Sequence, residues 1–349
     1  MRIKAFITHK IKENFADCQD RFAVNQDTKS IAVSDGMGST WQQKIWAQLL
    51  VEKFSENTDW HPNLESIKPL CTLWRQKVEA FIQDLKDTNA PENMIYRNER
   101  NLAERRSAGA TFVGIRFDGN NWNGSVLGDS CLIEWDGSRA TFYTSQDIDA
   151  FDSYPDYFDS DVMKEGKGSP KDINGTLSAY KCILLVSDPF SDFLLEANKQ
   201  GTIGEYFRNI LALSSHQDFE TLVNDWRNEG MHNDDATMVI VENDGTDYFT
   251  LEVVDDIEDL KRQESIEEED SHKVTVDTAD TQIEEEEVSS SKDDESNPNN
   301  DNPQFDIDKI IDEFAEGLKK NWPRRKEQKF KNILEVAVKL LHNILNKQK

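Results

Sequence analysis

The sequence predicts an α+β fold in which helices cover antiparallel sheets, followed by an acidic linker and a helical tail. Predicted strands come in runs and do not alternate strictly with helices, which favours antiparallel pairing. Two long amphipathic helices separate an early hairpin from the central run of strands. The composition then turns sharply acidic near residue 255. These observations divide the chain into a main domain, 1–254, a linker, 255–304, and a tail, 305–349.

The main domain begins with a hairpin whose second strand spans 30–34. Helices are predicted over 41–54 and 64–85, because apolar residues recur there on one helical face. Short β-rich segments bounded by Gly, Asp or Asn follow, at 110–117, 122–127, 131–135, 181–187 and 237–242. No internal repeat is visible.

The linker, 255–304, contains 19 acidic and four basic residues, a net charge of −15. Its apolar residues are too sparse to offset the entropy of ordering, so we expect a disordered spacer. The tail, 305–349, has a net charge of +4 and apolar residues at helical spacing on either side of Pro323. Two interpretations stay open: helices that dock a partner or self-associate, and a hairpin folded onto the main domain or the linker.

Charge and cysteine content exclude several classes of protein. The net charge of −27, from 40 basic and 67 acidic residues, argues against non-specific binding to nucleic acid. No apolar run approaches the roughly 18 residues of a membrane-spanning helix. The four cysteines are scattered, which argues against a disulfide framework or a structural zinc site and predicts a cytoplasmic location.

Aspartates stand at the ends of the predicted strands. Asp20 precedes a strand, Asp35 and Asp188 follow strands, and Asp129 and Asp234 lie at strand boundaries. One such aspartate alone usually caps a turn. Several together cannot all ionise at one point without cations, because like charges raise each other's pKa. Hard divalent ions, Mg²⁺ or Mn²⁺, would solve that problem.

Six short motifs carry these aspartates or lie between them, at residues 18–22, 34–39, 107–111, 128–130, 184–188 and 233–237. In this order they resemble the motifs of the metal-dependent protein phosphatases of the type 2C family, and in particular its divergent bacterial branch. The resemblance covers about residues 1–254. It implies a central β-sandwich flanked by pairs of helices, with a two-metal site at one end.

The resemblance also implies the site residues. A binuclear Mn²⁺ or Mg²⁺ pair would be held by the carboxylates and one backbone carbonyl of Asp20, Asp35, Gly36, Asp188 and Asp234. Asp129 and Asp192 would help to hold a third, weaker ion. A metal-activated water would then attack phosphorus, so no nucleophilic side chain is expected.

Two positions depart from the family pattern. Phe15 stands where many members carry an Arg that grips the substrate phosphate, and Phe cannot replace it. His9, Lys10, Lys12 or Arg21 could bind phosphate instead; we expect His9 as the phosphate contact or general acid, with Arg21 as a further catalytic residue. Pro189 follows Asp188 where a Gly is usual, so the local loop is expected to differ.

The leading hypothesis is therefore a bacterial Mn²⁺- or Mg²⁺-dependent serine/threonine protein phosphatase whose substrate is a phosphoprotein, such as a cognate kinase. A pseudophosphatase that binds phosphoproteins as a scaffold, and a hydrolase of small phosphoesters, are the alternatives. By position, residues 146–176 resemble the flap beside the family's site. Removing residues 255–349 is expected to leave turnover of a small ester largely intact.

Overall fold

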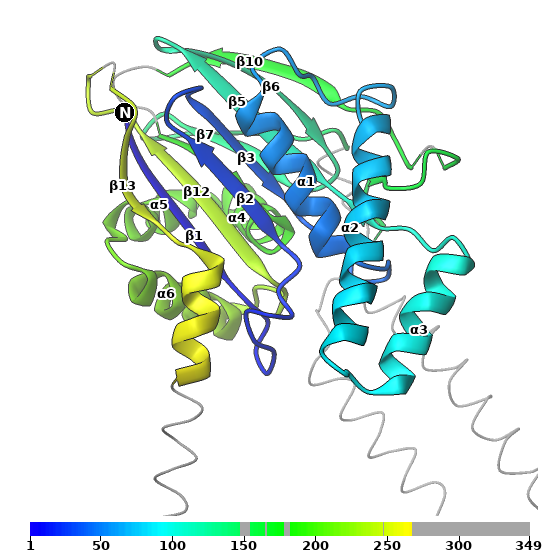
Figure 1. Ribbon diagram of the computed structural model, residues 1–349. Coiled ribbons are helices and arrows are strands. Elements are labelled where there is room, and N and C mark those ends of the chain that lie inside the picture. The colour runs from blue at the N-terminus through cyan, green and yellow to red at the C-terminus, as the bar shows by residue number, and fades with distance from the viewer. Residues whose placement is uncertain (147–153, 165, 178–181, 247, 267–349) are drawn as a thin grey trace, which may run out of the picture. The chain divides into compact units, whose positions relative to one another are not determined.

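The computed structural model describes residues 1–146, 154–164, 166–177, 182–246 and 248–266 (Figure 1). All of them belong to the first of two units, Met1–Asp277 and Thr278–Lys349. The expected tail, 305–349, and residues 267–304 of the expected linker lie outside the described residues.

Two sheets form the centre of the unit. The first has the order β13-β1-β12-β11-β7-β8, with β13 Thr250–Val254, β1 Arg2–Thr8, β12 Ala236–Glu242, β11 Cys182–Val186, β7 Cys131–Trp135 and β8 Ala140–Tyr143. The second has the order β10-β6-β5-β3-β2, with β10 Lys171–Thr176, β6 Asn121–Leu127, β5 Phe112–Asp118, β3 Ser30–Ser34 and β2 Arg21–Asn25. Every described strand pair is antiparallel except β1–β13. The predicted α+β class is confirmed.

The two sheets pack face to face and are covered by helices on both outer sides (Figure 1). Alternate residues such as Ile3, Val33 and Val239 fill the space between the sheets. Helices α1, Gln43–Glu56, and α2, Lys68–Asp87, are the main cover of the five-stranded sheet. The six-stranded sheet is covered by α4 Asp188–Gln200, α5 Ile203–Ala212 and α6 His216–Glu229.

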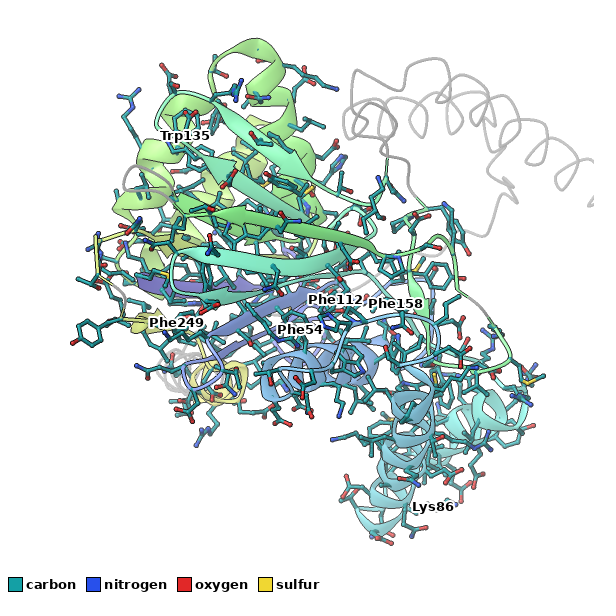
Figure 2. The ribbon with its side chains drawn as sticks, turned by 90° about the horizontal axis from the view of Figure 1, so that it is seen from above. Phe54, Lys86, Phe112, Trp135, Phe158 and Phe249 are labelled. Carbon is teal, nitrogen blue, oxygen red and sulfur yellow. The ribbon has the colours of Figure 1, made fainter. Side chains whose placement is uncertain are left out.

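Aromatic side chains mark the two outer layers. The rings of Phe54, from α1, and Phe112, from β5, meet at 5.3 Å under one sheet (Figure 2). Trp135, on the opposite side of the sandwich, stacks on Phe207 of α5 at 4.6 Å. These contacts fix which helices cover which sheet, as expected for a sandwich flanked by helices.

Helix α3, Glu92–Ala103, was not predicted. Among its residues only Asn98 is buried, so the sequence carries a weak apolar signal. It packs on α2, where Lys86 forms an ion pair with Glu99 at 2.7 Å. Lys86 lies at the tip of the helical arm in Figure 2.

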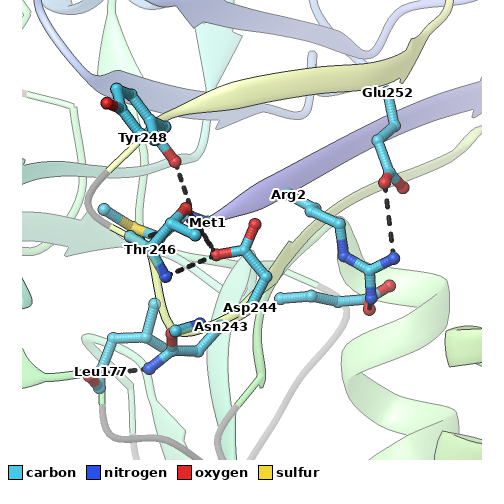
Figure 3. A network of polar contacts seen from close by, with 10 residues as sticks. Met1, Arg2, Leu177, Asn243, Asp244, Thr246, Tyr248 and Glu252 are labelled. Carbon is cyan, nitrogen blue, oxygen red and sulfur yellow. Dashed lines mark hydrogen bonds and ion pairs between the residues drawn. The ribbon is translucent and has the colours of Figure 1, made fainter.

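Strand β1 was also not predicted, although it is an interior strand of its sheet, between β13 and β12. Lys4 interrupts the apolar pattern of β1, but its ammonium is buried and paired with Glu242 at 2.9 Å. Beside it, the N-terminal ammonium of Met1 donates to Asp244 Oδ1 and to the carbonyl of Tyr248, both at 2.7 Å (Figure 3). These bonds tie β1 to the turn that leads into β13.

The expected linker begins later than the sequence predicted. β13 lies parallel beside β1, and residues 257–266 form a helix directly after it. Leu260 of this helix is 7% exposed and packs with Ile7, Phe15 and Cys18. Residues 255–266 therefore belong to the folded unit. Their composition alone predicts disorder, but Leu260 is buried, and Asp255 and Glu264 accept backbone hydrogen bonds from the N-terminal segment. We call 255–266 the strap.

Candidate active site

The strand registers bring the expected site residues to one end of the sandwich. Thr8 of β1 is opposite Ala236 of β12, and Val186 of β11 is opposite both Met238 and Cys131. In the other sheet, Arg21 of β2 is opposite Ser34 of β3. The aspartates at 20, 35, 129, 188 and 234 therefore lie just beyond paired strand ends on the same side.

These carboxylates lie close enough to perturb one another. Burial, followed by the charges of Asp188 and Asp129, raises the pKa of Asp35 well above its usual value. Burial, followed by the charges of Asp129 and Asp234, does the same to the pKa of Asp188. For Asp20 the causes are burial and then the charge of Asp35. A cluster of this kind favours cations or protons.

Buried oxygens without partners mark the centre of the cluster. Both carboxylate oxygens of Asp20 and the Oδ1 of Asp188 are buried and accept no hydrogen bond of ordinary geometry. The hydroxyls of Ser187 and Thr237 are near enough to lower the pKa of Asp20, but burial outweighs them. Unsatisfied buried carboxylate oxygens fit a hard divalent cation. Among the described residues, no three Asp, Glu, His or Cys side chains are arranged as the ligands of one ion.

Asp129 and Asp192 lie at the edge of the cluster. Gly128 precedes Asp129 with φ of 96°, and its N–H donates to Ser145 Oγ at 2.8 Å. Ser191 Oγ in turn donates to the Asp129 carbonyl at 2.6 Å. Asp192 Oδ2 lies 3.3 Å from His232 Nε2 on the half-exposed side of the site.

Asp235 is a site residue that the sequence reasoning missed. Its carboxylate is 2% exposed and accepts the backbone N–H groups of Lys10, at 3.1 Å, and Gln19, at 2.8 Å. It therefore joins the chain segments that carry the phosphate-contact candidates and Asp20. The doubled aspartate at 234–235 was the available signal: the first can face the site while the second holds the loops.

Proline at 189 fits the local structure. Helix α4 begins at Asp188, so Pro189 occupies the first turn, where its missing N–H removes no helical hydrogen bond. Asp188 then lies at the positive end of the α4 dipole. The local loop, which Pro189 was expected to change, is thus the start of helix α4, and this helix start also carries the Asp188 carboxylate.

Residues 9–154 match the family model described as "Protein phosphatase 2C". Over these residues, which make up less than half of the chain, the sequence is similar to the type 2C protein phosphatases. The match supports a phosphoprotein phosphatase, and the matched family in general depends on Mn²⁺ or Mg²⁺. No protein of curated function matches the sequence.

Several solved structures are similar. A mutant bacterial serine phosphatase shares 14% identity and a TM-score of 0.45, over 70% of this chain and 99% of that one. Stp1 from Staphylococcus aureus is 13% identical, with a TM-score of 0.45, and the match covers 70% of this chain and 95% of that one. The Mycobacterium tuberculosis serine/threonine phosphatase PstP/Ppp shares 19% identity and a TM-score of 0.40, over 69% and 99%.

Phe15, at the position where the resemblance leads one to expect an arginine, is an apolar anchor. Phe15 is 5% exposed, packs edge-on against the His9 ring at 4.7 Å and lies 5.8 Å from the ring of His216. It helps to seat the strap through Leu260. Phe15 therefore serves packing.

Among the described contacts, neither of the two expected catalytic residues bonds a carboxylate of the cluster. His9 Nδ1 donates to the Lys10 carbonyl at 2.8 Å, and Nε2 lies 3.2 Å from Glu264 Oε1 of the strap. The Arg21 guanidinium donates to the Cys18 and Asp20 carbonyls. Arg21 also lines a cavity of about 640 Å³ between α1, β2 and the strap, which none of the expected metal ligands lines. Catalytic roles for His9 and Arg21 stay predictions.

Lys10 is a cation that contacts the cluster. Its Nζ lies 2.9 Å from Asp234 Oδ1. Burial lowers the pKa of Lys10, but the hydrogen bond and charge of Asp234 and the charge of Asp235 outweigh it and raise that pKa above its usual value.

One part of the expected flap lies beside the Asp35 loop, whereas its last residues, 171–176, form the edge strand β10 of the five-stranded sheet. Strand β9, Phe158–Asp159, pairs with β4, Gly109–Ala110, and Ala110 forms a bridge with Gly36. A side chain at Gly109 would meet the sulfur of Met37 and the ring of Tyr157, so glycine allows these two to pack beside the site.

Proposed function

We propose that this type 2C protein is a Mn²⁺- or Mg²⁺-dependent serine/threonine phosphatase that hydrolyses phosphoprotein monoesters. The observation that carries the proposal is the set of mutually perturbed carboxylates at one end of the sandwich, with unsatisfied buried oxygens on Asp20 and Asp188. A cytoplasmic location stays a prediction. No helix in the described part of the chain is long and apolar enough to cross a membrane.

Asp20, Asp35, Asp188, Asp234 and the Gly36 carbonyl would hold two ions, and Asp129 with Asp192 a third. When bound, the ions would supply an activated water and neutralise charge on the phosphoryl oxygens. The protein's part is orientation. The paired strand ends fix the carboxylates, and the Asp235 bonds to Lys10 and Gln19 hold the loop beside them.

The test is hydrolysis of p-nitrophenyl phosphate and of phosphoserine and phosphothreonine peptides, with and without Mn²⁺. Asp35→Asn and Asp188→Asn should each lower kcat/KM by about a hundredfold or more, because each removes one charged ligand. Asp118→Asn is the matched control, since Asp118 is exposed at the end of β5 away from the site. Activity that survives in both site variants would contradict the proposal.

The same experiment decides between the alternatives. A small-phosphoester hydrolase would turn over metabolite esters and leave the phosphopeptides intact. A pseudophosphatase would bind Mn²⁺ and phosphopeptides without turnover. Phe15 is the one remaining departure that favours the latter, because Pro189 fits the helix start.

A further inference from the structure

The segment that precedes Asp20 is fastened to the segment that carries Asp234. The Ile11 N–H donates to Asn233 Oδ1 at 2.8 Å, and the Lys10 N–H donates to Asp235 Oδ1 at 3.1 Å. One guanidinium nitrogen of Arg227, in α6, donates to the carbonyls of both His9, at 2.9 Å, and Asp234, at 2.7 Å. Side chains near residue 10 are therefore held in register with the Asp234 carboxylate.

This fastening places one ammonium group at the rim of the carboxylate cluster. Lys10 Nζ contacts Asp234 Oδ1 at 2.9 Å, and the Lys10 side chain is 20% exposed. Together with burial, the charge of Asp234 in turn raises the pKa values of Asp35 and Asp188. An ammonium carries three N–H donors, and the contact with Asp234 uses one of them. The group is thus both anchored to the site and accessible from solvent.

Two of the other cations considered for phosphate binding, His9 and Arg21, bind other groups, and the third, Lys12, is exposed. Both ring nitrogens of His9 face acceptors, the Lys10 carbonyl and Glu264. Arg21 bonds two backbone carbonyls and opens on a separate cavity. A phosphate monoester dianion that approaches a carboxylate-rich site needs fixed positive charge beside it.

We propose that Lys10 is the phosphate-binding cation of this phosphatase. It takes the place of the arginine that many family members carry at the position of Phe15. The proposal rests on the proposed function of the carboxylate cluster. Asp234 holds the ammonium beside the site, and the remaining N–H donors bind the phosphoryl oxygens of substrate and product. A lysine acts there as a point charge, so the bidentate geometry of an arginine is not reproduced.

The test uses the full-length Mn²⁺-loaded protein and inorganic phosphate as the probe, with affinities measured by calorimetry. Lys10→Met, which keeps the stem and removes the charge, should weaken phosphate binding by about 10- to 100-fold and raise KM for p-nitrophenyl phosphate similarly. Lys10→Arg should retain most of both. Lys29→Met is the matched control, because Lys29 lies in the β2–β3 turn at the opposite strand ends.

Mn²⁺ affinity is measured on the same variants. It should stay or increase in Lys10→Met, because an ammonium that competes for Asp234 has been removed. Phosphate binding by Lys10→Met within about twofold of wild type would overturn the proposal. Loss of Mn²⁺ binding in this variant would overturn it too, because Lys10 would then serve to position Asp234. Loss of phosphate binding in His9→Gln with Lys10→Met unaffected would assign the role to His9. A wild-type protein without turnover would contradict the proposed function, while its phosphate affinity would still decide the role of Lys10.

Discussion

Glu264 Oε1 lies 3.2 Å from His9 Nε2, and Glu264 Oε2 accepts the Phe15 N–H at 2.9 Å. One carboxylate of the strap thus holds both ends of the loop that leads to Asp20. At the other end of the strap, Asp255 accepts the Ile7 N–H at 2.9 Å. The first twelve residues of the segment expected to be a linker therefore support the active-site loop.

The contacts of the strap revise the expected effect of truncation. A chain that ends after Ile266 should keep the stability of the catalytic unit. Removal of residues 255–266 as well should cost about 3–6 kcal/mol, from charged hydrogen-bond acceptors and the burial of Leu260. Melting temperatures of the two truncated proteins, measured by circular dichroism, check this. Equal melting temperatures would show that the strap is dispensable and would restore the boundary at 254.

The carboxylate cluster predicts a stability that depends on metal. Without metal, the raised pKa values of Asp35 and Asp188 mean that ionisation destabilises the folded state. The contribution of these groups is favourable below about pH 4 and is lost as pH rises through their folded-state pKa values. Mn²⁺ should therefore raise the melting temperature at pH 7, and chelation should lower it.

The variant Asp35→Asn separates charge from packing at this cluster. It should raise the melting temperature of the metal-free protein, because it removes one repelling charge, and reduce the increment that Mn²⁺ gives. Asp118→Asn should change neither quantity. A metal-free Asp35→Asn protein less stable than wild type would contradict mutual repulsion as the dominant effect.

His216 predicts a second pH dependence. Burial lowers its pKa, but hydrogen bonds to Asp255 and Glu220 outweigh burial and raise the pKa to about 9. Because the folded-state pKa exceeds the unfolded one, the stabilisation is complete below about pH 6.5 and is lost as pH rises through 9. With allowance for solvent screening, we expect a loss of about 1 kcal/mol. Thermal melts between pH 6 and 10 should show this loss in wild type and not in His216→Gln.

Gly128, next to Asp129, should not tolerate a side chain. Its φ is 96°, and a Cβ would lie 2.6 Å from the Asp156 carbonyl oxygen. Gly137 has a similar φ, 94°, with no atom within 4 Å of a Cβ. Gly137→Ala should cost about 1–2 kcal/mol, from backbone strain alone. Gly128→Ala should cost more and also weaken Mn²⁺ binding; equal denaturation midpoints for the two variants would contradict the steric argument.

Much of this protein follows from local pattern. The predicted hairpin, α1 and α2, the central strands and the aspartates at their ends were readable because apolar spacing and turn residues act over a few positions. The boundary of α2 shifted by a few residues, since its start is set by the preceding loop. The family resemblance ordered the same motifs, and the matched family model covers the four of them that lie within residues 9–154.

Three features depended on contacts between distant residues. Lys4 interrupts the apolar pattern of β1, so the sequence does not predict this strand. In the structure the buried Lys4 ammonium pairs with Glu242. The strap looked disordered because Leu260, Asp255 and Glu264 are stabilised by the N-terminal segment, which lies some 250 residues away in the sequence.

The choice among basic residues near the site was the third. The sequence leaves His9, Lys10, Lys12 and Arg21 as candidates and favours His9. Only the tertiary structure places Lys10 against Asp234 while His9 pairs with Glu264. Residue type and order therefore determined the fold class and the carboxylate set. The partner of each charged side chain was decided by packing, because a buried charge is stable only where a counter-charge from another part of the chain reaches it.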